Sequence, residues 1–292
     1  MSDRKIKGSL LKIVLIVLLI ILLGGAVFYK HDKYKRYIEL QPTVGNMNGI
    51  ELTIPASFRG YSPEYKGESV WRPLPDPPER THKSKLDSFH LVVIRPYMEN
   101  HKQKENMAAR HANKKINDSA KEKISIEVQT LFENKPSESV KGIIADSKAH
   151  GVYLYPFFDA LKLGYTRQKQ DDYEKKFDEL LKLNVITPIG PHAHEVYSGN
   201  TIYYWDGDVR IYPNDDPLDY LPHNIKGKVN TIIECPNSNI KVSHYDRCTQ
   251  YYEIPELGAR VTLNYDRQML PYWRDMQQKS QSLILSFKHS AH

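Results

Sequence analysis

The residues closest to a chemical site in this sequence are His192, His194 and Glu195, which follow a Pro- and Gly-containing loop. Two imidazoles separated by one residue point to the same side of a β-strand, where they can bind one metal ion. The sequence identifies no third or fourth ligand, and a surface strand that begins at this loop explains the same residues. The expected metal and cofactor content is therefore none.

Two acidic pairs, Asp206-Gly207-Asp208 and Asp215-Asp216, offer carboxylates for Ca²⁺ binding or acid–base catalysis. Neither has the ligand spacing of an EF-hand, and both occur where Asp residues commonly form turns. The sequence also lacks the local motifs of serine hydrolases, zinc proteases, P-loop proteins and dinucleotide-binding folds. Since no catalytic residue can be named, the sequence favours a binding protein over an enzyme.

The two cysteines, Cys235 and Cys248, enclose a turn signal at residues 236–239 between strand-like runs. A hairpin would bring both sulfurs within bridging distance, and closing a loop of this size adds about 3 kcal/mol of stability. Two buried thiols in a cytosolic domain are the alternative. An even cysteine count beside a membrane segment favours the disulfide, and with it an oxidising compartment.

The longest apolar run lies near the N-terminus, where residues 13–29 contain no charged side chain. A helix of this length covers roughly 26 Å, close to the hydrocarbon thickness of a bilayer. A cleaved signal peptide is the alternative, but bulky and basic residues follow where a cleavage site should stand. We expect a single transmembrane helix of the inner membrane, with residues 1–12 as a cytoplasmic tail, residues 30–37 as a linker and residues 38–292 in the periplasm. Basic residues flank both sides equally, so this orientation rests on the short tail and the cysteine pair.

The net positive charge of the chain lies on the two flanks of this apolar run. The formal net charge is +6, residues 1–36 hold eight basic and two acidic groups, and residues 37–292 hold 33 of each. A neutral domain has no overall attraction to nucleic acid. Residues 101–123 are rich in lysine but lack interleaved aromatic residues that stack on bases, so we expect a mobile insertion or a solvated helix and no nucleic-acid partner.

Short alternating runs predict an antiparallel sheet in the remainder of the chain. The expected strands are residues 49–58, 89–94, 124–131, 194–205, 209–212, 229–234, 251–254 and 260–265, with a tight turn at 206–208. Apolar spacing predicts amphipathic helices over residues 167–185 and from residue 268 onward. The predicted fold class is α+β, with a single N-terminal transmembrane helix followed by an antiparallel-sheet domain with an amphipathic C-terminal helix. A subdivision near residues 160–170 stays open.

Tyrosine is abundant, with 20 residues against 8 Phe and 3 Trp. The clusters Tyr203-Tyr204-Trp205 and Tyr251-Tyr252 could supply rigid anchors for a protein interface. The alternative is that these strands belong to the core. In that case about half of each cluster should face inward, because alternate residues of a strand point to opposite faces.

The C-terminal part combines several of these features in a familiar order. A strand ends in Cys235, a turn leads to Cys248 and an aromatic strand, and then come residues 258–265, 270–273 and 283–287. Together with the early strand at residues 52–55, this pattern resembles membrane-anchored, periplasm-facing proteins associated with bacterial type VI secretion genes. Several members of that group are regarded as immunity proteins against secreted toxins.

The resemblance implies a periplasmic, non-enzymatic protein that neutralises a type VI secretion toxin by direct binding. The toxin would be encoded nearby and would be a lipase or another envelope-targeting effector. The resemblance transfers no contact residues, so Cys235 and Cys248 are the only site residues expected. Two alternatives stay open: a structural or adaptor component of a cell-envelope complex, and an envelope hydrolase or metal-dependent enzyme built on His192, His194 and an Asp.

Overall fold

The structure, a computed structural model, describes residues 41–68, 79–95, 98–100, 123–131, 148–149, 151–152, 157, 173–189, 201–211, 225–237 and 246–289. The chain divides into two compact units, Met1–Pro42 and Thr43–His292. Every element described below belongs to the second unit. The expected transmembrane segment at residues 13–29 lies outside the described residues, as do the tail and the linker that flank it.

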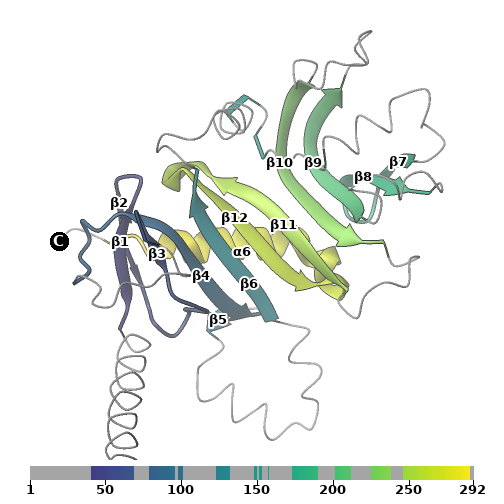
Figure 1. The fold of residues 1–292 in the computed structure, drawn as a ribbon. Helices are drawn as coiled ribbons and strands as arrows, with labels where there is room; N and C mark the ends of the chain where they lie inside the picture. Colours follow the sequence, from purple (N-terminus) through teal and green to yellow (C-terminus); the bar gives the residue numbers. More distant parts are fainter. Residues whose placement is uncertain are drawn as a thin grey trace, which may run out of the picture. The chain divides into compact units, whose positions relative to one another are not determined.

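An antiparallel sheet of ten strands forms the centre of the second unit (Figure 1). Its strands are β3 (Glu64–Tyr65), β4 (Leu86–Ile94), β5 (Glu99–Asn100), β6 (Lys123–Thr130), β7 (Tyr173–Asp178), β8 (Leu183–Pro188), β9 (Thr201–Ile211), β10 (Ile225–Pro236), β11 (Arg247–Ile254) and β12 (Ala259–Asp266). The spatial order is β3-β4-β6-β12-β11-β10-β9-β8-β7, and β5 pairs with β4. The last strand, β12, therefore joins β6 to β11 and completes the sheet.

The alternation of buried and more exposed side chains explains why most of these segments form strands. In β11 and β12 every second residue is buried and the residues between them are half-buried or exposed, and β6 follows the same alternation as far as Val128. Because successive side chains of a strand point to opposite faces, one face of the sheet is the apolar core. The strands expected at 89–94, 124–131, 229–234, 251–254 and 260–265 are confirmed within β4, β6, β10, β11 and β12.

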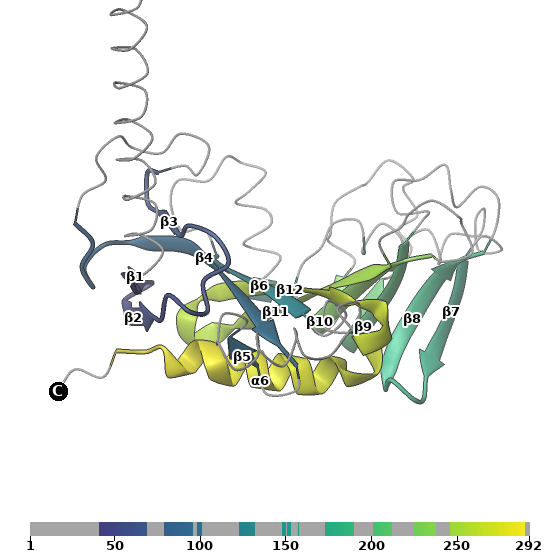
Figure 2. The same ribbon diagram turned by 90° about the horizontal axis from the view of Figure 1, so that it is seen from below.

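The helix α6 (Trp273–Ser286) lies along the apolar face of the sheet (Figure 2). It follows the short helix η5 (Arg267–Tyr272), where the Asp266 carboxylate accepts a hydrogen bond from the Gln268 amide at 3.0 Å. The side chains that α6 buries recur at helical spacing: Trp273, Met276, Ser280 and Ile284. The expected amphipathic C-terminal helix is confirmed.

Polar groups beneath α6 are paired across the helix–sheet contact. The hydroxyls of Tyr252 and Ser280 lie 2.7 Å apart. The Gln277 side-chain oxygen accepts from Gln250 Nε2 and from the Thr231 hydroxyl, each at 2.8 Å. Because a buried polar group without a partner costs stability, these bonds favour one position of α6 on the sheet.

A separate hairpin of β1 (Thr43–Met47) and β2 (Ile50–Ile54) precedes the sheet in the chain. Asn48 and Gly49 form its turn with φ of 51° and 92°, and a two-residue hairpin turn of this kind requires positive φ at both positions. The Asn48 side chain donates to the Leu257 carbonyl at 2.9 Å, which ties the turn to the connection between β11 and β12.

The residues after α6 pair with β2. The Thr53 N–H donates to the Phe287 carbonyl at 2.9 Å, and the His289 N–H donates to the Glu51 carbonyl at 2.8 Å. The C-terminal tail therefore adds a short extended segment to the β1–β2 hairpin.

The expected fold class, an α+β domain behind a transmembrane helix, is wrong for the part of the chain that the structure describes. The described residues form a mostly antiparallel sheet with α6 at its C-terminal end. None of the helices in this described part is long and apolar enough to cross a bilayer. The expected inner-membrane location is corrected as well: what the described residues support is a disulfide between Cys235 and Cys248, which is typical of an oxidising compartment.

The helix expected over residues 167–185 is also wrong, because its described part is the hairpin of β7 and β8. Phe177 and Leu180, which would belong to its apolar face, are 49% and 85% exposed. The turn has local support, since Asp178 Oδ1 accepts from the amides of Leu180 and Leu181 at 3.0 and 2.9 Å. A side chain that caps a turn in this way competes with helix formation.

Residues 206–208 do not form the expected tight turn, because β9 continues through them and pairs with β10. Gly207 has φ of 130°, and a Cβ there would lie 2.2 Å from the Lys228 carbonyl oxygen. The β9–β10 register shifts between Val229 and Thr231. The glycine thus permits a close backbone approach at a bulge and does not mark a hairpin.

Candidate functional site

The sequence-predicted metal ligands and acidic pairs do not form a site in the described part of the chain. Asp206 and Asp208 lie in β9, and no third ligand among the described residues joins them. The other candidates lie outside the described residues: His192, His194, Glu195, Asp215 and Asp216.

Cys235 and Cys248 form the expected disulfide, with an S–S distance of 2.01 Å and a Cα–Cα distance of 4.3 Å. They lie on the paired strands β10 and β11, and both are fully buried in the core beneath α6. A disulfide is typical of proteins that work in an oxidising compartment.

The tyrosine-rich strands contribute more to the core than to the surface. Tyr203, Tyr204 and Trp205 are all buried, because apolar clusters cover both faces of β9. In β11, Tyr252 is fully buried and Tyr251 is half-buried on the opposite face. The expectation that about half of a cluster faces inward therefore holds for Tyr251-Tyr252 and fails for residues 203–205.

The sheet face opposite α6 carries a charged network of Glu234, Tyr251, Glu253 and Arg260. The Tyr251 hydroxyl donates to Glu234 Oε1 at 2.6 Å. Burial raises the pKa of the Glu234 carboxyl, and the bond from Tyr251 partly opposes that shift. Burial lowers the pKa of Arg260, whose guanidinium lies 3.8 Å from the Glu253 carboxylate. These contacts within the sheet favour a structural role for the network.

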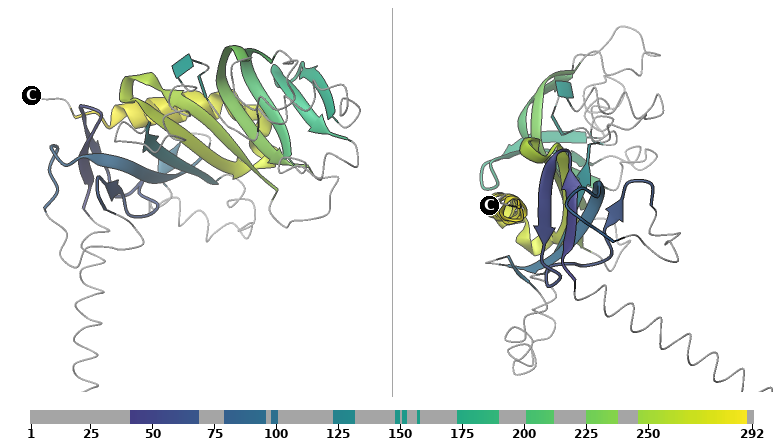
Figure 3. Two further views of the ribbon diagram at one scale, coloured as in Figure 1. Left: turned by 45° about the horizontal axis from the view of Figure 1, so that its top comes forward. Right: turned by 90° about the vertical axis from the view of Figure 1, so that its left-hand side faces the viewer.

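The strand β7 is the last of the sheet, at the end farthest from β3 (Figure 3). Exposed apolar side chains gather at this end. Of the five large hydrophobic residues that are exposed in the described part, three belong to this hairpin or follow it directly: Phe177, Leu180 and Ile189. Leu180 is 85% exposed, the largest fraction among them. We call residues 177–182, which contain Phe177 and Leu180, the hairpin tip.

Charged side chains surround these apolar residues. Glu174, Lys175 and Lys176 are exposed along β7, and Lys182 pairs with Glu179 at 2.8 Å in the hairpin tip. Charges on an edge strand oppose uncontrolled pairing with other strands. The hairpin tip is therefore suited to side-chain contacts with a specific partner rather than to open-ended strand addition.

The hairpin tip is anchored from the inside. Leu181 is 9% exposed and belongs to the core beneath α6, and its carbonyl accepts from Trp273 Nε1 at 3.0 Å. Leu183, at the start of β8, is fully buried. The backbone of the turn is therefore held in place, so binding through Leu180 needs little further ordering of the backbone.

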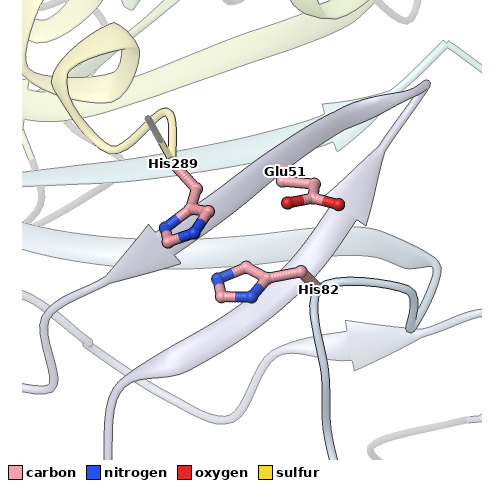
Figure 4. A group of neighbouring side chains, drawn as sticks. All are labelled: Glu51, His82 and His289. Carbon is pink, nitrogen blue, oxygen red and sulfur yellow. The ribbon is translucent and has the colours of Figure 1, made fainter. Parts of the chain in front are cut away.

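A second candidate site brings together Glu51, His82 and His289 (Figure 4). Glu51 lies in β2, His82 precedes β4, and His289 follows α6. One ligand atom from each residue lies within 4.8 Å of the other two. Imidazole nitrogens with a carboxylate oxygen are a ligand set that suits zinc and related divalent metals.

Comparison with known proteins finds distant structural likeness and no match in sequence. No protein-family model matches the chain, and no characterised protein matches it in sequence. An immunity protein of the Stenotrophomonas maltophilia type IV secretion system shares 13% identity over 86% of this chain and 94% of its own, with a TM-score of 0.46.

The iron-regulated outer membrane lipoprotein FrpD of Neisseria meningitidis shares 11% identity over 86% of this chain and 93% of its own, with a TM-score of 0.40. Both TM-scores lie below 0.5, so neither likeness establishes a family for the chain.

Sequence reasoning missed both the hairpin tip and the histidine–carboxylate group. The hairpin tip had one local signal, the acidic pair Asp178-Glu179 ahead of Leu180-Leu181, which resembles a turn as much as a helix. The group of Glu51, His82 and His289 had no signal in the sequence, because its members are far apart along the chain.

Proposed function

We propose that this chain is a non-enzymatic binding protein of an oxidising compartment, and that it neutralises a secreted toxin by direct contact. The observation that carries the proposal is the hairpin tip. Leu180 is 85% exposed next to a residue that is anchored to the core. A few residues dominate the binding energy of a protein–protein interface, and we assign that part to the exposed apolar side chains of this anchored turn.

The immunity role in particular is supported by the C-terminal pattern and its structure. The segments that resemble immunity proteins fold as adjacent parts of one unit: β10, β11, β12 and α6, with the Cys235–Cys248 disulfide between the first two strands. The disulfide also supports a periplasmic or extracellular place of action. The finer proposal is a toxin of a type VI secretion system, a lipase or another envelope-targeting effector encoded nearby.

Titration calorimetry with the toxin encoded beside this gene tests the proposal. The full chain should bind it in a 1:1 complex, and Leu180→Asp should weaken binding by about 30-fold or more, as expected for a central interface residue worth about 2 kcal/mol. Gln278→Asp is the matched control, because it adds the same charge on an exposed position of α6 and should leave the affinity unchanged.

Two results would contradict the proposal. One is the absence of binding to any protein encoded nearby, and the other is binding that Leu180→Asp leaves unchanged. Stable co-purification with envelope proteins in the absence of any toxin would instead favour the adaptor alternative.

A further inference from the structure

The outward face of β2 provides the first part of a second site. Glu51 and Thr53 are half-buried on this face, whereas Leu52 and Ile54, which point the other way, are buried in the core. This arrangement follows from the alternation of side chains along a strand. The Glu51 carboxylate is therefore held at the surface by a strand whose other face is fixed.

A local turn holds His82 opposite β2. The Ser84 amide donates to the Thr81 carbonyl at 2.9 Å, and the Asn46 amide donates to the Ser84 carbonyl at 2.7 Å. The Thr53 hydroxyl lies 2.8 Å from His82 Nε2. The position of the imidazole is thus set from β2 as well as from its own turn.

The C-terminal tail supplies the third residue. The His289 amide donates to the Glu51 carbonyl at 2.8 Å, so the backbone of the tail is fixed beside the carboxylate. The rings of His289 and His82 are stacked, with centroids 4.2 Å apart and planes 22° from parallel. Three segments that are distant in sequence therefore present ligand-type atoms to one place.

The spacing of the three side chains fits a shared ion better than mutual hydrogen bonds. Their ligand atoms lie within 4.8 Å of one another, yet within the described ranges no hydrogen bond or ion pair joins these side chains to each other. Zinc with bonds of about 2.0–2.1 Å in tetrahedral geometry separates its ligand atoms by about 3.4 Å. His289 is exposed, so its side chain has room to rotate toward that spacing.

We propose that Glu51, His82 and His289 bind one divalent transition-metal ion of the zinc type. Two imidazoles disfavour Ca²⁺ and Mg²⁺, which prefer oxygen ligands. Three protein ligands leave a fourth position for water or for a group from a partner. The ion joins β2, the turn before β4 and the tail after α6, so it stabilises the end of the fold that lacks the disulfide.

Zinc titration of the full chain, purified without a polyhistidine tag, tests this site. Calorimetry should show one saturable site, and either His82→Ala or His289→Ala should lower the affinity by about 100-fold or more, since loss of even an outer-shell partner costs about 10–100-fold. Added zinc should raise the melting temperature of the wild type and not that of His289→Ala, because a ligand stabilises only the state that binds it.

The double variant His192→Ala/His194→Ala is the control, because these residues are the competing metal candidates in the sequence. It should bind zinc like the wild type. His289 is exposed, so His289→Ala without zinc should melt at the wild-type temperature, which separates loss of a ligand from loss of the fold. Absence of a saturable site, or wild-type affinity in both single variants, would overturn the proposal, as would loss of binding in the control alone.

Discussion

The core beneath α6 and the hairpin tip use similar residues in opposite ways. Leu263 in β12 is fully buried, whereas Leu180 in the hairpin tip is 85% exposed. Beneath α6 the polar groups are paired with one another, and a disulfide joins β10 to β11. The first region therefore accounts for the stability of the fold. The second exposes apolar surface that the fold itself does not use, which points to a partner.

A hydrogen bond links the two regions, in addition to the packing of Leu181 in the core. Trp273 begins α6, and its indole N–H donates to the carbonyl of Leu181 in the hairpin tip. The core therefore positions the surface that we assign to binding. Substitutions in the core should mainly lower the free energy of unfolding, whereas substitutions in the hairpin tip should mainly lower the affinity for the toxin.

The largest expected difference is between two identical substitutions. Leu263→Ala should lower the free energy of unfolding by about 2–5 kcal/mol, because it leaves a cavity in the core. Leu180→Ala should change it by no more than about 0.5 kcal/mol, because the side chain is exposed. Urea denaturation of both variants measures the difference, and equal losses of stability would remove the distinction between the two regions.

Replacement of both cysteines by alanine should have the next largest effect on the same core. The loop closed by Cys235 and Cys248 predicts a loss of about 3 kcal/mol, measured by urea denaturation under non-reducing conditions. Because the folded variant keeps the bond between Trp273 and Leu181, its affinity for the toxin should change little at temperatures where it stays folded. An unchanged denaturation midpoint would contradict the role assigned to the disulfide.

Trp273→Phe tests the connection between the two regions. It keeps an aromatic ring in the core but removes the donor to the Leu181 carbonyl, a loss of about 1 kcal/mol. Amide hydrogen exchange at residues 180–183 should become faster, because the hairpin tip loses an anchor. Faster exchange throughout α6 with no change in the hairpin tip would show that the bond does not position it.

Glu234→Gln extends the comparison to the sheet face opposite α6. Burial raises the folded-state pKa of Glu234 above that of the unfolded chain, so ionisation costs stability as the pH rises through the folded-state pKa. The variant should therefore be more stable than the wild type at pH 7, and the gain should shrink as the pH falls toward about 4. Glutamine can still accept from Tyr251.

Urea denaturation of both proteins across this pH range measures the effect. Parallel stability curves for the two proteins would contradict the raised pKa.

The local spacing of apolar residues was sufficient to predict much of the fold. β6, β11, β12 and α6 were predictable, because their burial follows the period of the element itself. The disulfide was predictable as well, since its cysteines lie on strands that are consecutive in sequence. In these cases the residues that determine the structure are neighbours along the chain.

The sequence-based predictions fail where contacts between distant residues, or a single side chain, determine the local structure. Tyr173, Phe177 and Leu180 have helical spacing, but the Asp178 carboxylate caps a turn between them. In the sequence Gly207 resembles a turn residue, but in the structure it allows the backbone of Lys228 to lie close beside it. Glu51 and His289 meet only because the tail after α6 pairs with β2.

Hydrogen exchange of the full chain with and without its toxin tests the central claim most directly. The account predicts slower exchange at residues 177–182 in the complex, while the exposed side of α6 exchanges as it does in the free protein. Slower exchange confined to other surfaces, with the hairpin tip unchanged, would contradict the proposal that this hairpin binds the toxin.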